Sequence, residues 1–117
     1  DEISPCAPTN VYQIDEKGNE NSYVIDPANF GINDADEEEL YGGNGSDNAK
    51  LAMDVLKGGG RKTIRYAAGL NAGAVLYLCG KVHTLKEGYA MALEAIDSGK
   101  TLEKLKEIQK VSGELCA

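Results

Sequence analysis

Basic residues are in the minority in this sequence. Among 117 residues, twelve Lys and Arg stand against nineteen Asp and Glu, which gives a formal net charge of -7. Binding to nucleic-acid phosphates depends on clustered Lys and Arg. The composition therefore argues against a general nucleic-acid surface, and it gives no sign of a basic face for binding a membrane.

Cysteine and histidine are also scarce. The sequence contains Cys6, Cys79, Cys116 and a single histidine, His83, with no Cys-x-x-Cys pair, which excludes an ordinary zinc site. Cys79 lies in an apolar helical run, where we expect a small buried hydrophobe. Three widely spaced cysteines favour a reduced, cytoplasmic setting.

Long hydrophobic runs are missing as well. The longest mostly apolar stretch, residues 67–79, contains Asn71 and is too short to cross a bilayer. Apolar residues make up 42% of the chain and charged residues 26%, as in ordinary globular domains, and the length suits one domain with a modest core.

Residues 9–26 have the composition of an antiparallel β-hairpin. Residues 11–14 and 22–25 are rich in β-branched and aromatic side chains, and the polar segment between them carries Gly18 for a turn. Asp26-Pro27 should end the second strand, since Pro cannot donate to a ladder but suits the first turn of a short helix.

Residues 27–45 are predicted to be irregular. The acidic run from Asp34 to Glu39 lacks the alternating spacing and central Gly of a calcium loop, so we interpret it as a solvated face or a helix start. The segment Gly42-Gly43-Asn44-Gly45 has no following Lys-Ser/Thr. It therefore predicts a linker that enters a helix at Ser46 and not a phosphate-binding loop.

Residues 46–113 are predicted to form helices. Ser46 should cap the first, which ends at residues 58–60, and residues 63–79 form the second. The third starts at the capping box from Thr84 to Glu87, and the fourth runs from Thr101 to Gly113. Asn71 inside the second helix needs polar partners, and a hydrogen bond to a neighbouring loop is preferred over catalysis.

The expected fold is locally α+β, a hairpin followed by about four helices, as part of an α/β domain. A two-stranded hairpin is marginal as a sheet by itself, so the apolar helices suggest strands that lie elsewhere. The chain also begins without Met, at Asp1-Glu2 followed by Ile3-Ser4-Pro5, which we interpret as a cut from something larger.

Asp1 and Glu2 are the candidate metal ligands. Paired carboxylates on a loop are hard oxygen ligands of the kind that Mg²⁺ prefers when it keeps waters and bridges to phosphates. Two frayed, solvated residues at a chain end are the alternative interpretation.

The order of motifs resembles the last part of anthranilate phosphoribosyltransferase, over essentially the whole chain. The resemblance rests on residues 1–5 and 8–12, residues 23–27 with Phe30-Gly31, Gly42-Gly43, Asn48-Ala49, residues 55–58, residues 70–77, Glu87-Gly88 and residues 92–100. Ala7, where a Gly is common, and Thr101, where Ala is usual, depart from the family pattern.

The resemblance implies an enzyme that transfers a phosphoribosyl group from phosphoribosyl diphosphate to anthranilate in tryptophan biosynthesis, and that forms homodimers. It also implies that Asp1 and Glu2 hold Mg²⁺ against the diphosphate. The family's Gly-Thr-Gly-Gly-Asp loop, its Lys-His-Gly-Asn-Arg segment and its anthranilate-contacting Arg are absent from these residues. We therefore assign no catalytic or substrate-binding residue and expect residues 1–117 alone to be inactive.

Two other interpretations stay open. A pyrimidine nucleoside phosphorylase, or another phosphoribosyltransferase of the same fold, would differ in acceptor-binding residues that this sequence does not contain. A non-catalytic interaction module would be a stable monomer without a large apolar patch. A chain cut from a larger one should instead associate to cover its apolar face.

Overall fold

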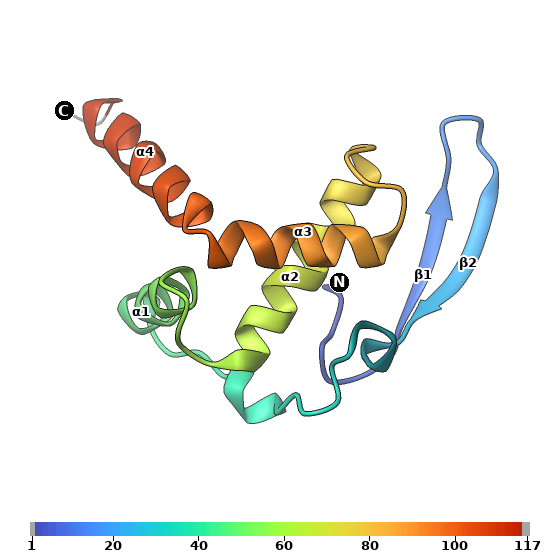
Figure 1. Ribbon diagram of the computed structural model, residues 1–117, viewed down its shortest axis with the longest axis horizontal. Helices are drawn as coiled ribbons and strands as arrows, with labels where there is room; N and C mark the ends of the chain where they lie inside the picture. The colour runs from blue at the N-terminus through green and yellow to red at the C-terminus, as the bar shows by residue number, and fades with distance from the viewer. Residues whose placement is uncertain (1, 116–117) are drawn as a thin grey trace.

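The computed structural model describes residues 2–115. A β-hairpin lies at one end and a group of helices at the other, with the connecting 3-10 turns below them (Figure 1). The elements are β1 Thr9–Ile14, β2 Glu20–Ile25, η1 Pro27–Phe30, η2 Glu37–Leu40, α1 Gly45–Leu56, α2 Lys62–Leu78, α3 Leu85–Asp97 and α4 Lys100–Leu115. The radius of gyration of 15.7 Å exceeds the roughly 13 Å expected for a compact chain of this length. The hairpin and α4 therefore project from the helical body.

The hairpin confirms the prediction from the sequence. The strands β1 and β2 pair antiparallel, from Thr9 opposite Ile25 to Ile14 opposite Glu20. At the turn the Asp15 carboxylate accepts hydrogen bonds from the Lys17 and Asn19 backbone N–H groups, each at 2.8 Å. Local polar groups therefore fix the register of a sheet that has only two strands among the described residues.

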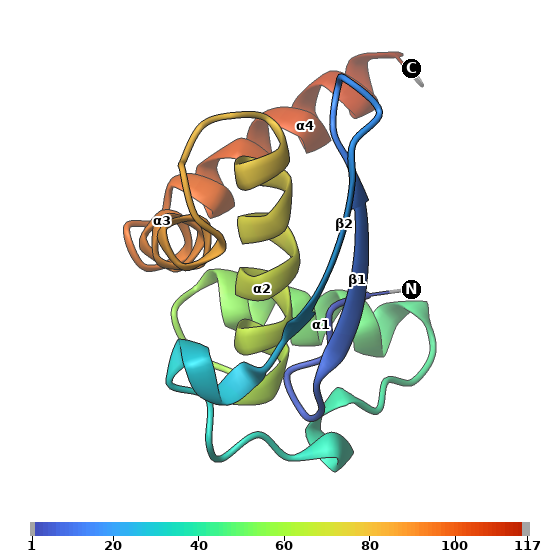
Figure 2. The same ribbon diagram turned by 90° about the vertical axis from the view of Figure 1, so that its right-hand side faces the viewer.

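Helices α2 and α3 form the centre of the molecule, where they cross closely (Figure 2). Gly73 of α2 and Gly88 of α3 meet backbone to backbone, since a Cβ added to Gly88 would lie 2.2 Å from the Gly73 carbonyl oxygen. Their missing side chains allow the two helices to approach more closely than larger residues would permit.

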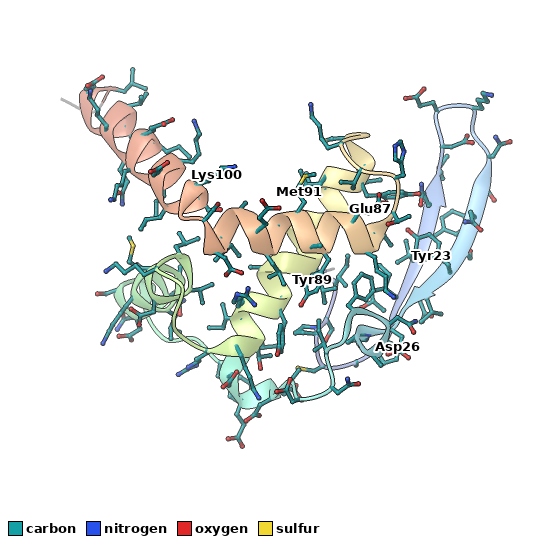
Figure 3. All side chains as sticks on the ribbon, viewed as in Figure 1. Tyr23, Asp26, Glu87, Tyr89, Met91 and Lys100 are labelled. Atoms are coloured by element: carbon teal, nitrogen blue, oxygen red, sulfur yellow. The ribbon has the colours of Figure 1, made fainter. Side chains whose placement is uncertain are left out.

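A small apolar core lies beside this crossing. Ile32, Leu70 and Tyr89 are buried together, and Phe30 packs edge-on against Tyr89 with ring centroids 5.6 Å apart. Burial raises the pKa of the Tyr89 hydroxyl. Figure 3 shows Met91 on the other side of α3 from Tyr89, where it is largely exposed. Phe30 belongs to η1, so its contact with Tyr89 attaches this short helix to the helical body.

The four predicted helices are confirmed, but some of their ends differ. Asn44 and not Ser46 caps α1, because the Asn44 side chain accepts from the Ser46 and Asp47 N–H groups. Helix α4 continues through Gly113 to Leu115, since one Gly in an exposed helix costs only about 1 kcal/mol. The capping box of α3 from Thr84 to Glu87 is present as predicted.

The expected burial of Cys79 is wrong. This residue caps the C-terminus of α2 and is exposed, because the last turn of α2 extends past the packed part of α3. Within residues 2–115, no helix combines the length and the apolar character that crossing a bilayer would require.

Candidate functional site

The candidate metal ligands lie at the start of the chain. Asp1 falls outside the described residues, and Glu2 is exposed. Within the described part of the chain, His, Cys, Asp and Glu side chains form no group of three or more that could hold a metal ion.

The residue that follows the acidic pair is held in place by α2. The Ile3 backbone N–H donates to Asn71 Oδ1 at 2.9 Å, and the Ile3 carbonyl oxygen accepts from Asn71 Nδ2 at 3.0 Å. The Ile3 side chain packs against the core cluster of Ile32, Leu70 and Tyr89. Ile3 is therefore anchored by its backbone on one side and by its side chain on another.

The hydrogen bonds of Asn71 fix the orientation of its amide group. Besides the bond to Ile3, Asn71 Nδ2 donates to the Ala67 carbonyl oxygen at 2.9 Å. Both amide hydrogens are thus used, and a flipped amide would turn its oxygen toward two carbonyl oxygens. The expected structural hydrogen bond from Asn71 to a neighbouring loop is confirmed, and its partner is the N-terminal segment.

Hydrogen bonds continue along the segment after Ile3. The Ser4 N–H donates to Thr9 Oγ1 at 3.1 Å, and the Cys6 N–H donates to Ser4 Oγ at 3.1 Å. Pro5 between them is buried. Desolvation raises the pKa of the Cys6 thiol, and the nearby carboxylates of Glu37 and Asp36 add to this effect.

A groove of about 430 Å³ opens beside Ile3, between the hairpin and α2. Its walls include Val11, Tyr23, Tyr77 and Leu78. Tyr23 donates a hydrogen bond to Gln13 Oε1 at 3.1 Å, and burial raises the pKa of the Tyr23 hydroxyl. Among the described residues, no Asp, Glu, Lys or Arg lines this groove, which suits an apolar group better than a phosphate.

Side chains of the acidic run from Asp34 to Glu39 bind to the first turn of α2. Among residues 2–115 they form no group that could hold a metal ion. Asp34 forms an ion pair with Lys62 at 2.6 Å. Hydrogen bonding to Lys62 lowers the pKa of Asp34. The Glu39 carboxylate accepts from the Thr63 N–H at 2.8 Å, which satisfies a free donor in the first turn of α2. Asp36 caps η2, so this part of the run is the helix start that the sequence predicts.

Two backbone donors of the glycine-rich loop before α1 are occupied. The Gly43 N–H donates to Asn48 Oδ1 at 2.8 Å, and the Asn44 N–H donates to Asp47 Oδ2 at 3.2 Å. A loop that cradles phosphate needs free backbone N–H groups. The interpretation of residues 42–45 as a helix-entry linker is therefore preferred.

Residues 1–102 match the family model described as "Glycosyl transferase family, a/b domain", and the chain therefore belongs to this family. A curated anthranilate phosphoribosyltransferase from Shewanella sp. (strain MR-4) is 39% identical over 97% of this chain, and one from Alkaliphilus metalliredigens (strain QYMF) is 38% identical over 98%. The crystal structure of anthranilate phosphoribosyltransferase from Thermus thermophilus superposes with a TM-score of 0.69 and 38% identity over 79% of this chain.

These comparisons confirm the family resemblance and the fold predicted from the sequence. The chain spans about a third of the length of the curated relatives, at 33%, and 27% of the chain in the solved structure. The family match begins at residue 1 and therefore includes both members of the acidic pair.

Two interactions were not predictable in detail from the sequence. Asn71 was recognised as a mid-helix polar residue, but its partner lies 68 positions away in the sequence. Glu39 caps α2 across 24 positions, whereas capping signals in a sequence extend over only about three or four residues.

Proposed function

We propose that this chain is part of an enzyme that transfers a phosphoribosyl group from phosphoribosyl diphosphate to anthranilate, with release of diphosphate, in tryptophan biosynthesis. The observation that carries the proposal is the 39% identity to an anthranilate phosphoribosyltransferase over 97% of this chain. A common family match from residue 1 to residue 102 supports it.

This chain would contribute the metal-binding pair, Asp1 and Glu2, to the reaction. Asp1 and Glu2 would hold Mg²⁺, because adjacent carboxylates and few other protein ligands suit an ion that also binds water and phosphate oxygens. When bound, the ion would neutralise the negative charge that develops on the departing diphosphate. Asn71 and the core hold the chain immediately after this pair in a fixed position.

The chain by itself is proposed to be inactive. The described residues offer a groove that no charged side chain lines, and their acidic run is engaged in ion pairing and helix capping. The relatives are about three times as long, so further parts of such an enzyme would supply the remaining contacts to both substrates.

A cytoplasmic homodimer is part of the proposal. Cys6 and Cys79 are free thiols, as a reducing compartment would keep them. Exposed apolar residues on α4, among them Ile108 and Val111, could be covered by a second copy. Light scattering over a concentration series would test this, with a monomer at all concentrations counting against it.

The complete gene product carrying this chain should convert phosphoribosyl diphosphate and anthranilate to phosphoribosyl anthranilate in the presence of Mg²⁺. The consumption of anthranilate fluorescence is the readout. Phosphorolysis of a pyrimidine nucleoside in place of this reaction would favour the related phosphorylase. If neither reaction occurs with folded protein, a non-catalytic role is the better interpretation.

The role of the pair is tested separately by Glu2→Gln, which keeps the size of the side chain and removes its charge. We expect a higher Mg²⁺ requirement for turnover. Glu16→Gln, an exposed residue in the hairpin turn, is the matched control with the same loss of charge and should behave like the parent.

A further inference from the structure

We infer that Asn71 is a positioning residue for Glu2 of the proposed metal-binding pair, because it sets the orientation of the peptide unit that contains the Glu2 Cα atom. This inference rests on the proposed function, since it assigns a second residue to the same site. It concerns a side chain on α2 that comes 69 positions after Glu2 in the sequence.

The first step is the planarity of the peptide bond. The N–H of Ile3 belongs to the peptide unit that also contains the Cα and carbonyl group of Glu2, and these atoms lie close to one plane. The bond from Ile3 N to Asn71 Oδ1, at 2.9 Å, therefore orients this whole unit and not Ile3 alone. The position of the Glu2 Cα atom is thereby tied to α2, and the Glu2 ψ torsion and the side-chain torsions remain to place its carboxylate.

The second bond fixes the following peptide unit. Asn71 Nδ2 donates to the Ile3 carbonyl oxygen at 3.0 Å, so the Asn71 amide pairs with both polar groups of Ile3, as a neighbouring strand would. The Ile3 side chain on the core cluster prevents the segment from rotating about these two bonds. The peptide units on both sides of Ile3 are thus immobilised together.

The third step is that the hydrogen bonds at this position require a side-chain amide, with one acceptor and two donor hydrogens. Aspartate has no hydrogens to donate to the Ile3 and Ala67 carbonyl oxygens, and leucine has neither donor nor acceptor. Asparagine is also a poorer residue than alanine for a helix interior. Its presence in the third turn of α2 is explained by the anchoring of Ile3.

The test uses the complete gene product and two readouts. The first is the dissociation constant of Mg²⁺ in the presence of inorganic diphosphate, measured by isothermal titration calorimetry. The second is the hydrogen-exchange rate of the Ile3 amide. Asn71→Leu keeps the branched shape of the side chain and removes its amide, and Asn71→Ala serves as a second variant if the leucine protein does not fold.

We expect Asn71→Leu to weaken Mg²⁺ binding about tenfold, as loss of a residue that orients a metal ligand typically does. Exchange of the Ile3 amide should accelerate in the same protein. Thr63→Val is the matched control, because it also removes one side-chain to backbone bond of α2, the 3.0 Å bond from the Asp36 N–H. It should leave both readouts near those of the parent.

Glu2→Gln separates the inference from the proposed function. If Glu2→Gln weakens Mg²⁺ binding but both Asn71 variants bind like the parent, the positioning role is overturned and the metal-binding pair stands. An equal loss in Thr63→Val would also overturn it, because the effect would then be general destabilisation. If Glu2→Gln itself has no effect, the proposed metal role fails and the inference fails with it.

Discussion

Helices α3 and α4 follow each other in the chain and have similar apolar spacing, yet they differ in what covers them. In α3 the apolar side is buried at Tyr89, Ala92 and Ile96. In α4, within the described part of the chain, no residue is buried, and Ile108 and Val111 are 58% and 53% exposed. Figure 1 shows α4 leading away from the α2–α3 pair. Apolar periodicity therefore defines a face of a helix, but it does not identify a partner for that face.

Gly88→Ala is predicted to have the largest effect, because it attacks the close approach that distinguishes α3 from α4. The added Cβ would lie 2.2 Å from the Gly73 carbonyl oxygen and 2.9 Å from its carbonyl carbon. Backbone atoms cannot move aside as a flexible side chain can, so the two helices must separate. We expect the free energy of unfolding to fall by more than about 3 kcal/mol, measured by urea denaturation.

Gly113→Ala in α4 is the matched control for that substitution. No atom of the described residues lies within 4 Å of a Cβ added there, and the position is helical and exposed. Alanine in place of glycine in a helix interior should stabilise the protein by up to about 1 kcal/mol. Equal effects of the two substitutions would contradict the difference in packing between α3 and α4.

Truncation of an apolar side chain should destabilise the protein at a buried position much more than on the exposed helix α4. Leu70→Ala empties a buried position of the core and should cost about 3 kcal/mol. Ile108→Ala in α4 should change the free energy of unfolding by less than about 0.5 kcal/mol. A cost at Ile108 close to that at Leu70 would mean that α4 is covered in solution, as the proposed homodimer requires.

Removal of a helix cap should lower the free energy of unfolding by less than the truncation of Leu70 does. Thr84→Ala removes the acceptor for the Glu87 N–H at the start of α3 and should cost about 1 kcal/mol by thermal denaturation. Asn44→Ala should cost a similar amount in α1. Ser46→Ala is the control that separates the observed cap from the residue expected on sequence grounds, and it should be nearly neutral. A larger loss at Ser46 than at Asn44 would reverse this assignment.

The sequence predicted the elements whose signals are local. The hairpin follows from alternating β-branched residues and Gly18, and the start of α3 follows from the spacing of Thr84 and Glu87. The cap of α1 lies at Asn44 and not at the predicted Ser46, because both residue types are good caps and sequence alone does not show where the helical dihedral angles begin.

What the sequence did not reveal depends on contacts between distant segments. Asn71 was expected to bond to a loop, but its pairing with Ile3 requires knowing that the N-terminal segment passes beside α2. Burial of Cys79 was predicted from its apolar neighbours, whereas exposure depends on where α3 stops covering α2. The roles of Asp1 and Glu2 stay predictions, with Asp1 outside the described residues.

The smallest predicted effect concerns the link between the acidic run and α2. Hydrogen bonds from Thr63 hold the pKa of Glu39 below its usual value of about 4.3. The charged form is therefore favoured in the folded state, and its stabilising contribution is present above the usual pKa and is lost as the pH falls through the lower folded pKa. Glutamine at this position could still accept the Thr63 N–H, but without the charge that favours the N-terminus of a helix.

Glu39→Gln should therefore destabilise the protein slightly at neutral pH, and the difference from the parent should shrink as the pH is lowered toward about 3. Urea denaturation at both pH values measures this. Glu38→Gln, at the exposed neighbouring position, is the control with the same change in charge and should lack this pH-dependent difference. Indistinguishable pH profiles for the two variants would show that Glu39 acts only through the net charge of the acidic run and not as the cap of α2.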